Sequence, residues 1–138
     1  MMNTSLNRDW SKLKEPFKAK LTAVFADLAG HGLQLFLQEG FRTVARQKWL
    51  YAQGRTRRGP VITFKNGVES KSFHQSGFAA DVIFANEDGS HYWPPLRMPN
   101  GKLAPEWALL ASSAKSHRLT WGGSWKTVDS PHLEYRSV

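Results

Sequence analysis

The sequence contains no cysteine among its 138 residues. Disulfide bonds, thiolate nucleophiles and zinc sites built from cysteine are therefore all excluded. Any metal site in this chain must use histidine, aspartate or glutamate side chains as ligands. The lack of disulfides fits synthesis in a reducing compartment.

Long apolar runs are also missing. No stretch reaches the length of a membrane span, and the opening MMNTSLNRDWSKLKEPFKAK has no apolar run of the kind found in secretory signal peptides. The sequence has no low-complexity tail and no repeat at a fixed period. We therefore expect one domain over residues 1–138, made without a signal peptide, not inserted into a membrane, and monomeric.

Acidic residues are scarce relative to basic ones, with 11 against 19, which gives a formal net charge of +8. This excess favours an anionic partner such as nucleic acid, a cell-wall polymer or an acidic membrane surface. The basic residues cluster over residues 42–58. A solvated basic loop is the simplest alternative interpretation of that cluster.

The order of expected elements predicts an α+β fold: a small antiparallel-rich sheet with helices on one side. Leu13, Phe17, Leu21, Phe25 and Leu28 recur at helical spacing. Asp9 or Ser11 can cap the start of that helix, and Pro16 indicates that the first turn lies near it. Proline and glycine punctuate the rest of the chain. The expected helices cover residues 9–30, 43–54 and 105–119, the expected strands cover 33–40, 78–84, 119–123 and 132–136, and residues 86–102 are expected to be irregular.

A carboxylate stands at the edge of an expected core strand, because Asp81 is followed at once by Val82, Ile83 and Phe84. A buried carboxylate is costly unless it is paired with a cation or bound to a metal. His74 lies seven residues upstream, and Gly77 allows the chain between them to turn. Asp81 can therefore belong to a metal site, or can form an ion pair with an arginine.

A second polar group occurs in the segment DSPHLEY, which contains Asp129, His132 and Glu134. Pro131 interrupts any regular strand there, so Asp129 and His132 can face the same point. Two histidines and a carboxylate form a common open zinc site. The alternatives are that the histidines are ordinary polar residues, that Asp129 caps a turn, and that Glu134 forms a salt bridge or supports a ligand.

Three segments, in order along the chain, resemble one family of enzymes. They are GFRTVARQKWLYAQGRT, SFHQSGFAAD and WGGSWKTVDSPHLEY. In the second segment, Ser72, His74, Gly77, Ala79 and Asp81 match the family pattern. Together, over about residues 36–136, the segments resemble the L-alanyl-D-glutamate endopeptidases of phage endolysins. Those enzymes belong with the D-alanyl-D-alanine carboxypeptidases and dipeptidases and share a fold with the hedgehog signalling domain.

The resemblance implies a role for each matching residue. His74, Asp81 and His132 would bind one zinc ion. Asp129 would be the general base that takes a proton from the attacking water, and Arg42 would stabilise the oxyanion. The resemblance also implies that three further residues contact the substrate, namely Ser72, Gln47 and Trp125.

The resemblance further implies that the substrate is the peptide stem of peptidoglycan and that the cut falls between L-alanine and D-glutamate. It implies a phage or prophage lysin. We expect no separate wall-binding domain in this chain, which departs from the many endolysins of Gram-positive targets that have one. Such an enzyme is made in the host cytoplasm and reaches the wall after the membrane is permeabilised. A D-alanyl-D-alanine carboxypeptidase or dipeptidase is the alternative within the same class.

Two alternatives come from other classes of protein. The basic cluster, with Trp49 and Tyr51, is compatible with a nucleic-acid-binding domain. No recognised nucleic-acid motif accompanies it, so nucleic acid is not the expected partner. A metal-bound but inactive wall-binding module is the other alternative, and Asp129 argues against it because a binding module needs no general base.

Overall fold

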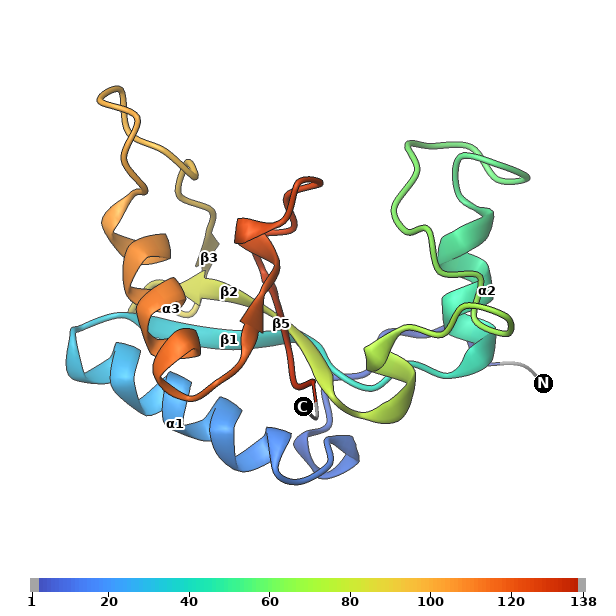
Figure 1. Ribbon diagram of the computed structural model, residues 1–138, viewed down its shortest axis with the longest axis horizontal. Coiled ribbons are helices and arrows are strands. Elements are labelled where there is room, and N and C mark those ends of the chain that lie inside the picture. The colour runs from blue at the N-terminus through green and yellow to red at the C-terminus, as the bar shows by residue number, and fades with distance from the viewer. Residues whose placement is uncertain (1–2, 137–138) are drawn as a thin grey trace.

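The computed structural model describes residues 3–136 (Figure 1). Three helices are α1 (Phe17–Gly30), α2 (Val44–Ala52) and α3 (Pro105–Ser116). Five strands are β1 (Gln34–Glu39), β2 (Ala79–Ala85), β3 (His91–Tyr92), β4 (Thr120–Trp121) and β5 (His132–Glu134). Three short 3-10 turns are η1 (Trp10–Lys12), η2 (Phe73–Ser76) and η3 (Gly122–Ser124).

The sheet is antiparallel throughout, with strand order β1-β2-β5-β4, and β3 pairs with the far end of β2. The predicted α+β class with a small antiparallel sheet is therefore confirmed. Asp81 lies opposite Glu39 of β1 on one side and opposite His132 of β5 on the other. This register places two acidic side chains and one histidine in a row across three strands.

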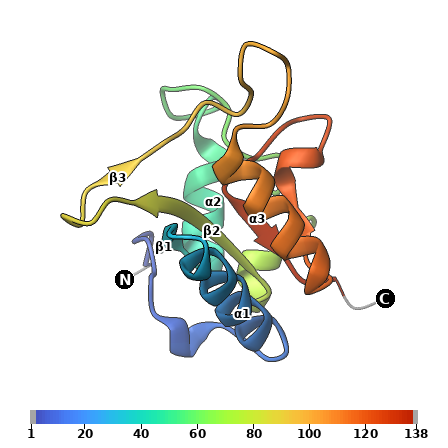
Figure 2. The ribbon, with the colours of Figure 1, turned by 90° about the vertical axis from the view of Figure 1, so that its left-hand side faces the viewer.

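Helices α1 and α3 pack against each other and against the sheet (Figure 2). Phe17 and Leu21 of α1 belong to the same core cluster as Trp107 and Leu110 of α3, and all four side chains are inaccessible to water. The indole ring of Trp107 also packs edge-on against Phe84 of β2. The helical spacing of apolar residues in the sequence therefore marks the buried faces correctly.

The first helix is shorter than predicted. It begins at Phe17 and not near Asp9, whose side chain instead caps η1 by accepting a hydrogen bond from the Ser11 N–H at 2.9 Å. Pro16 immediately precedes α1. Proline disfavours the helical conformation in the residue before it, so Glu15 cannot continue a helix into α1.

The second helix agrees with the sequence at its start. Thr43 caps α2, because its hydroxyl accepts a hydrogen bond from the Arg46 N–H at 3.0 Å. Helix α2 lies beyond the ends of β1 and β2, at the right of Figure 1, and does not share the layer formed by α1 and α3. The prediction of helices on one side of the sheet therefore holds for α1 and α3.

The C-terminal strands are also shorter than predicted, and one strand was missed. Residues 122–124 form η3 in place of the end of a strand, and the expected irregular stretch contains β3, whose Tyr92 pairs with Phe84. Among residues 3–136 no helix has both the length and the apolar character that crossing a bilayer requires.

Candidate metal centre

Three predicted ligands meet at one end of the sheet. His74 comes from η2, Asp81 from β2 and His132 from β5. One ligand atom from each side chain lies within 4.8 Å of the others. The structure therefore brings together, within one chain, the two histidines and the carboxylate that the sequence pattern singled out.

Local structure fixes the orientation of His74. Ser72 caps η2 in a reciprocal capping box with Gln75, and Gly77 ends the turn with a left-handed backbone (φ 77°). The His74 Nδ1–H donates to the carbonyl oxygen of Gly40 at 2.7 Å. This hydrogen bond directs Nε2 toward Asp81, whose Oδ1 lies 3.5 Å away.

His132 is held by acidic side chains on both sides. Its Nδ1 lies 3.2 Å from Asp81 Oδ1, and its Nε2 lies 2.7 Å from Glu134 Oε1. Arg136 in turn donates to Glu134 at 2.6 Å. Burial alone would lower the pKa of His132, but the hydrogen bonds to Asp81 and Glu134 raise that pKa to about 9.

The two histidines also determine the charge on Asp81. Burial would raise the pKa of the Asp81 carboxyl, but the charge of His74 and the hydrogen bond from His132 hold that pKa well below its usual range. Asp81 is therefore ionised near neutral pH. An ionised carboxylate is the form that ligates a metal.

Asp129 lies at the mouth of this cluster, in the turn before β5. Its Oδ2 is 4.0 Å from His132 Nδ1, and about half of its side chain is exposed. Partial burial and the nearby charge of Asp81 raise the pKa of the Asp129 carboxyl above its usual range. A solvent-accessible carboxylate with a raised pKa suits a general base.

Arg42 faces the Asp81 oxygen that the two histidines leave free, Oδ2. Its Nη2 lies 3.4 Å from Asp81 Oδ2 and 3.0 Å from Glu39 Oε1, and its Nη1 donates to the side-chain oxygen of Gln47 at 3.1 Å. Glu39 also accepts a hydrogen bond from Arg46 at 3.0 Å. The guanidinium is therefore held in place by three protein groups at the edge of the cluster.

Sequence reasoning missed Glu39, which is buried and shared by two arginines. The signal was available, because Leu35, Leu37 and Glu39 alternate along β1 and share its buried face. A carboxylate on a buried face needs cationic partners. Arg42 and Arg46 follow at three and seven positions along the chain.

The three residues expected to contact substrate differ in position. Gln47 is fully buried, and its amide donates to the carbonyl of Lys65 at 2.8 Å. The hydroxyl of Ser72 accepts from the N–H of His74 at 3.2 Å. Trp125 is half-buried, with its ring centroid 5.0 Å from that of His132, and so forms a wall of the cluster. Gln47 and Ser72 thus have partners within the protein.

The paired glycines of WGGSW allow close packing behind the site. A methyl group on Gly122 would overlap the carbonyl oxygen of Asp129 and would lie 3.1 Å from His132 Cβ. A methyl group on Gly123 would overlap the indole ring of Trp121. That ring is buried and donates to the carbonyl of Ser130 at 2.6 Å, which anchors the turn before β5.

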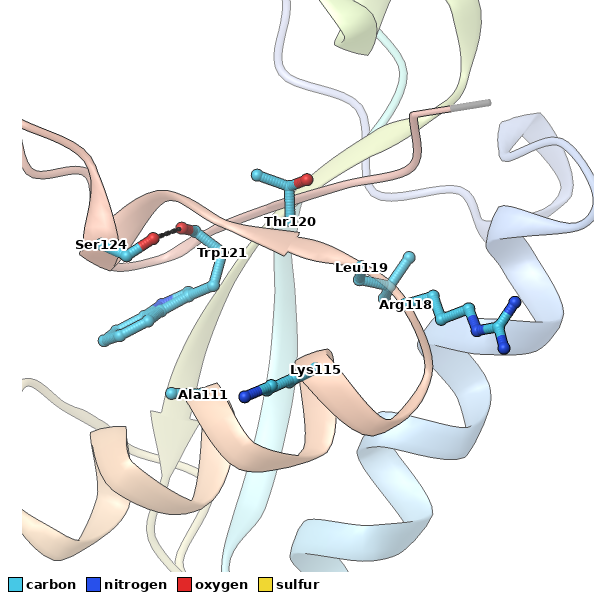
Figure 3. A pocket seen from close by; sticks show the side chains of 7 residues that line it. All are labelled: Ala111, Lys115, Arg118, Leu119, Thr120, Trp121 and Ser124. Atoms are coloured by element: carbon cyan, nitrogen blue, oxygen red, sulfur yellow. Dashed lines mark hydrogen bonds between the residues drawn. The ribbon is translucent and has the colours of Figure 1, made fainter. Parts of the chain in front are cut away.

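A cavity of about 470 Å³ lies between α3 and β4 (Figure 3). Figure 3 shows Trp121 and Ser124 on the strand side and Lys115 on the helix side. The residues that line it are Ala111, Lys115, Arg118, Leu119, Thr120, Trp121 and Ser124. None of them belongs to the His74, Asp81 and His132 cluster.

One further observation, separate from the types of residue in the cluster, indicates that the cluster can hold a metal ion. Among residues 3–136, only two buried side-chain nitrogens lack a hydrogen-bond partner, and one of them is Nε2 of His74. A buried nitrogen aimed at a carboxylate and a second histidine is satisfied when a cation lies between them. Two nitrogens and one oxygen, with one position open, suit zinc.

Comparisons with known proteins agree on one family. A family model described as D-alanyl-D-alanine carboxypeptidase matches residues 66–135. The chain is 36% identical over 125 residues to the peptidoglycan L-alanyl-D-glutamate endopeptidase CwlK of Bacillus subtilis, covering 90% of this chain and 74% of that protein. A solved structure, the Serratia marcescens L-Ala D-Glu endopeptidase ChiX, matches with a TM-score of 0.59 and 21% identity, covering 92% and 83% of the two chains. The latter similarity shows a shared fold.

Proposed function

The chain belongs to the M15 family of metallopeptidases, described as D-alanyl-D-alanine carboxypeptidases, and from this premise we propose that it is a zinc-dependent endopeptidase that cuts the L-alanyl-D-glutamate bond of peptidoglycan. The observation that carries the proposal is the convergence of the partly buried Asp81 with the buried His74 and His132, one of whose nitrogens, His74 Nε2, has no hydrogen-bond partner. The choice of bond is supported by the activity named for CwlK.

His74, Asp81 and His132 would hold the ion. A zinc ion in such a site supplies Lewis acidity, which polarises a peptide carbonyl and makes water more acidic. Gly40 and Glu134 fix the two histidine rings by accepting their other N–H groups. These acceptors keep the ligating nitrogens pointed at the centre.

Asp129 would move the proton. Its carboxylate lies at the open side of the cluster, where a water molecule and a substrate can both reach it. Its raised pKa makes it a stronger base than an ordinary aspartate. It can therefore take a proton from the attacking water and pass that proton to the leaving amine.

Arg42 would stabilise the negative charge that develops on the carbonyl oxygen during attack. A guanidinium stays charged at every relevant pH and donates in a fixed planar geometry. Glu39 and Gln47 hold it from behind. The same support leaves the guanidinium at the edge of the cluster, next to Asp81.

The test is digestion of purified peptidoglycan with chelator-treated enzyme, before and after zinc is restored, with released fragments identified by mass. Fragments with a new N-terminal D-glutamate, formed only with zinc, are expected. Free D-alanine would instead favour the carboxypeptidase activity in the family description. Digestion that continues in the presence of the chelator would show that the His74, Asp81 and His132 cluster is not required for cleavage.

Asp129→Asn tests the assigned base. We expect kcat to fall by about 10² to 10⁴ because general-base catalysis is lost, while the zinc content stays at one ion per chain. Asp88→Asn is the matched control, because Asp88 is exposed in the turn after β2. Normal cleavage by Asp129→Asn would assign the base to another group.

A role as a phage lysin that acts on the host wall is the finer form of this proposal. The three sequence segments that resemble phage endolysins support it. Expression in a bacterial cytoplasm, with and without a membrane-permeabilising protein, tests it. Lysis is expected only when the membrane is opened. Lysis without permeabilisation would contradict this route to the wall.

A further inference from the structure

Residues 44–73, here named the basic arm, concentrate both positive charge and exposed apolar surface. The segment contains seven basic residues and one acidic residue, Glu69, so it carries +6 of the formal +8 of the chain. Seven of the ten large apolar side chains that are exposed among residues 3–136 also lie here, namely Val44, Trp49, Val61, Ile62, Phe64, Val68 and Phe73. Phe64, at 71%, is the most exposed of them.

The basic arm is an ordered projection. Figure 1 shows α2 and the loop after it extending beyond the sheet, apart from α1 and α3. Three side chains of the arm tie this loop down: Gln47 donates to the Lys65 carbonyl at 2.8 Å, Gln53 to that of Pro60 at 3.1 Å, and Arg55 to that of Thr63 at 3.2 Å. The apolar side chains of residues 61–68 are therefore presented outward by a fixed backbone.

The positive charge of the arm remains available. Of its seven basic residues, only Arg46 lies within 4.0 Å of a carboxylate in the described part of the chain. The guanidinium groups of Arg55 and Arg57 lie over the rings of Tyr51 and Trp49, each 3.6 Å from the ring centroid. Stacking on a ring keeps the charge and leaves it unneutralised.

We propose that the basic arm docks the protein on the surface of an anionic phospholipid bilayer. A polyanionic polymer would use the cations and the aromatic rings, but it would gain nothing from Val61, Ile62 and Val68. The interface of an anionic bilayer accepts both, because apolar side chains enter the acyl boundary while basic ones meet the headgroups.

Docking through the arm would also place the metal centre close to the bilayer. Arg42 lies two residues before the arm, and His74 immediately follows it. Both residues lie beside Asp81. A protein held in this way would meet the part of the peptidoglycan that lies nearest the membrane.

Vesicle co-sedimentation of the full chain tests the proposal. Vesicles of phosphatidylcholine mixed with phosphatidylglycerol should bind the protein, and pure phosphatidylcholine should bind it much less. Each basic side chain at the surface contributes about a fivefold increase in partitioning, so added salt should weaken binding. Ile62→Ser combined with Phe64→Ser should lower binding by about tenfold or more, because less apolar surface is buried.

Matched control variants distinguish vesicle binding through the basic arm from nonspecific binding through other exposed side chains. Leu6→Ser removes an exposed apolar side chain outside the arm, and Lys102→Gln removes a basic one. Both should bind vesicles like the unchanged chain. Thermal melting of each variant establishes that it is folded. Asp129→Asn should also bind normally, so this test is independent of the peptidase activity.

Three results would overturn the proposal. The first is equal binding, or no binding, to the two kinds of vesicle. The second is normal vesicle binding by the folded Ile62→Ser, Phe64→Ser variant. The third is binding to a soluble polyanion such as heparin without binding to anionic vesicles, which would identify the arm as a site for a charged polymer.

Discussion

Replacement of Gly122 by alanine should disable the site although it changes none of the three predicted metal ligands. The added methyl group would overlap the carbonyl oxygen of Asp129 and would lie 3.1 Å from Cβ of His132 and 3.2 Å from Cβ of Asp129. None of these atoms is at the end of a flexible side chain. The turn that carries Asp129 and His132 must therefore move.

The size of the movement follows from ordinary contact distances. Carbon atoms pack at about 3.5–4.0 Å, so the turn must retreat by roughly half an ångström to one ångström. The carbonyl of Asp129 accepts the N–H of His132 at 3.1 Å, and the carbonyl of Gly122 accepts that of Asp129 at 2.9 Å. A displacement of about 1 Å at a catalytic group can reduce the rate by about 10², and overpacking costs about 1–3 kcal/mol of stability.

The assay measures kcat on a soluble stem-peptide fragment, zinc per chain and the melting temperature. Gly122→Ala should lower kcat by about a hundredfold, and should lower the melting temperature by several degrees. Gly30→Ala is the matched control, because a methyl group there would meet nothing within 4 Å. Unchanged kcat in a folded Gly122→Ala protein would refute the idea that this glycine sets the position of Asp129.

Three further predictions concern the groups around the ligands. Glu39→Gln weakens the ion pair that positions Arg42, so kcat should fall by roughly tenfold or more while the zinc content stays unchanged. Glu69 is exposed, so Glu69→Gln should have the kcat of the unchanged chain. Equal kcat values for the two variants would exclude a positioning role for Glu39. Glu134→Gln removes the charged acceptor of His132, so zinc affinity should fall by about ten- to a hundredfold, as measured by titration against a competing chelator. Glu106→Gln is the control, and equal zinc affinities of the two variants would contradict a role for Glu134. The pKa of about 9 keeps a proton on His132 near neutral pH, and zinc must displace this proton to bind. Zinc affinity should therefore increase with increasing pH, by up to about tenfold per pH unit as long as the pH is below about 9, and should level off above that pH. Calorimetry in buffers of different ionisation enthalpy would count the released proton, and a pH-independent affinity between about 6 and 8 would contradict the assigned protonation.

Local sequence signals predicted the secondary structure where local forces decide it. Thr43 caps α2 and Pro105 begins α3 as expected. The predicted early start of the first helix was wrong because the apolar spacing continues through Leu13, while Pro16 prevents a continuous helix there. A hydrophobic pattern reports which side chains are buried, and the backbone that carries them can still be a turn.

The sequence also indicated the candidate metal centre, and it offered Glu134 as a support for a ligand, which the contact with His132 Nε2 matches. His74, Asp81 and His132 stand out because they are polar residues beside core segments. Glu39 escaped notice, although strand alternation places it on the buried face of β1. Gln47, which the resemblance implies contacts substrate, is fully buried, and its side-chain amide contacts Arg42 and the carbonyl of Lys65.

The sequence by itself determined which chemistry is possible. With no cysteine, and with two histidines and two aspartates beside core strands, it predicted a histidine and carboxylate site in an α+β domain. Only the tertiary structure decided how each group is oriented. The acceptor for His74 Nδ1 lies 34 positions away along the chain, and the carboxylate beside His132 Nδ1 lies 51 positions away. Such partners are chosen by strand register and packing, which join distant segments and leave no local signal in the sequence.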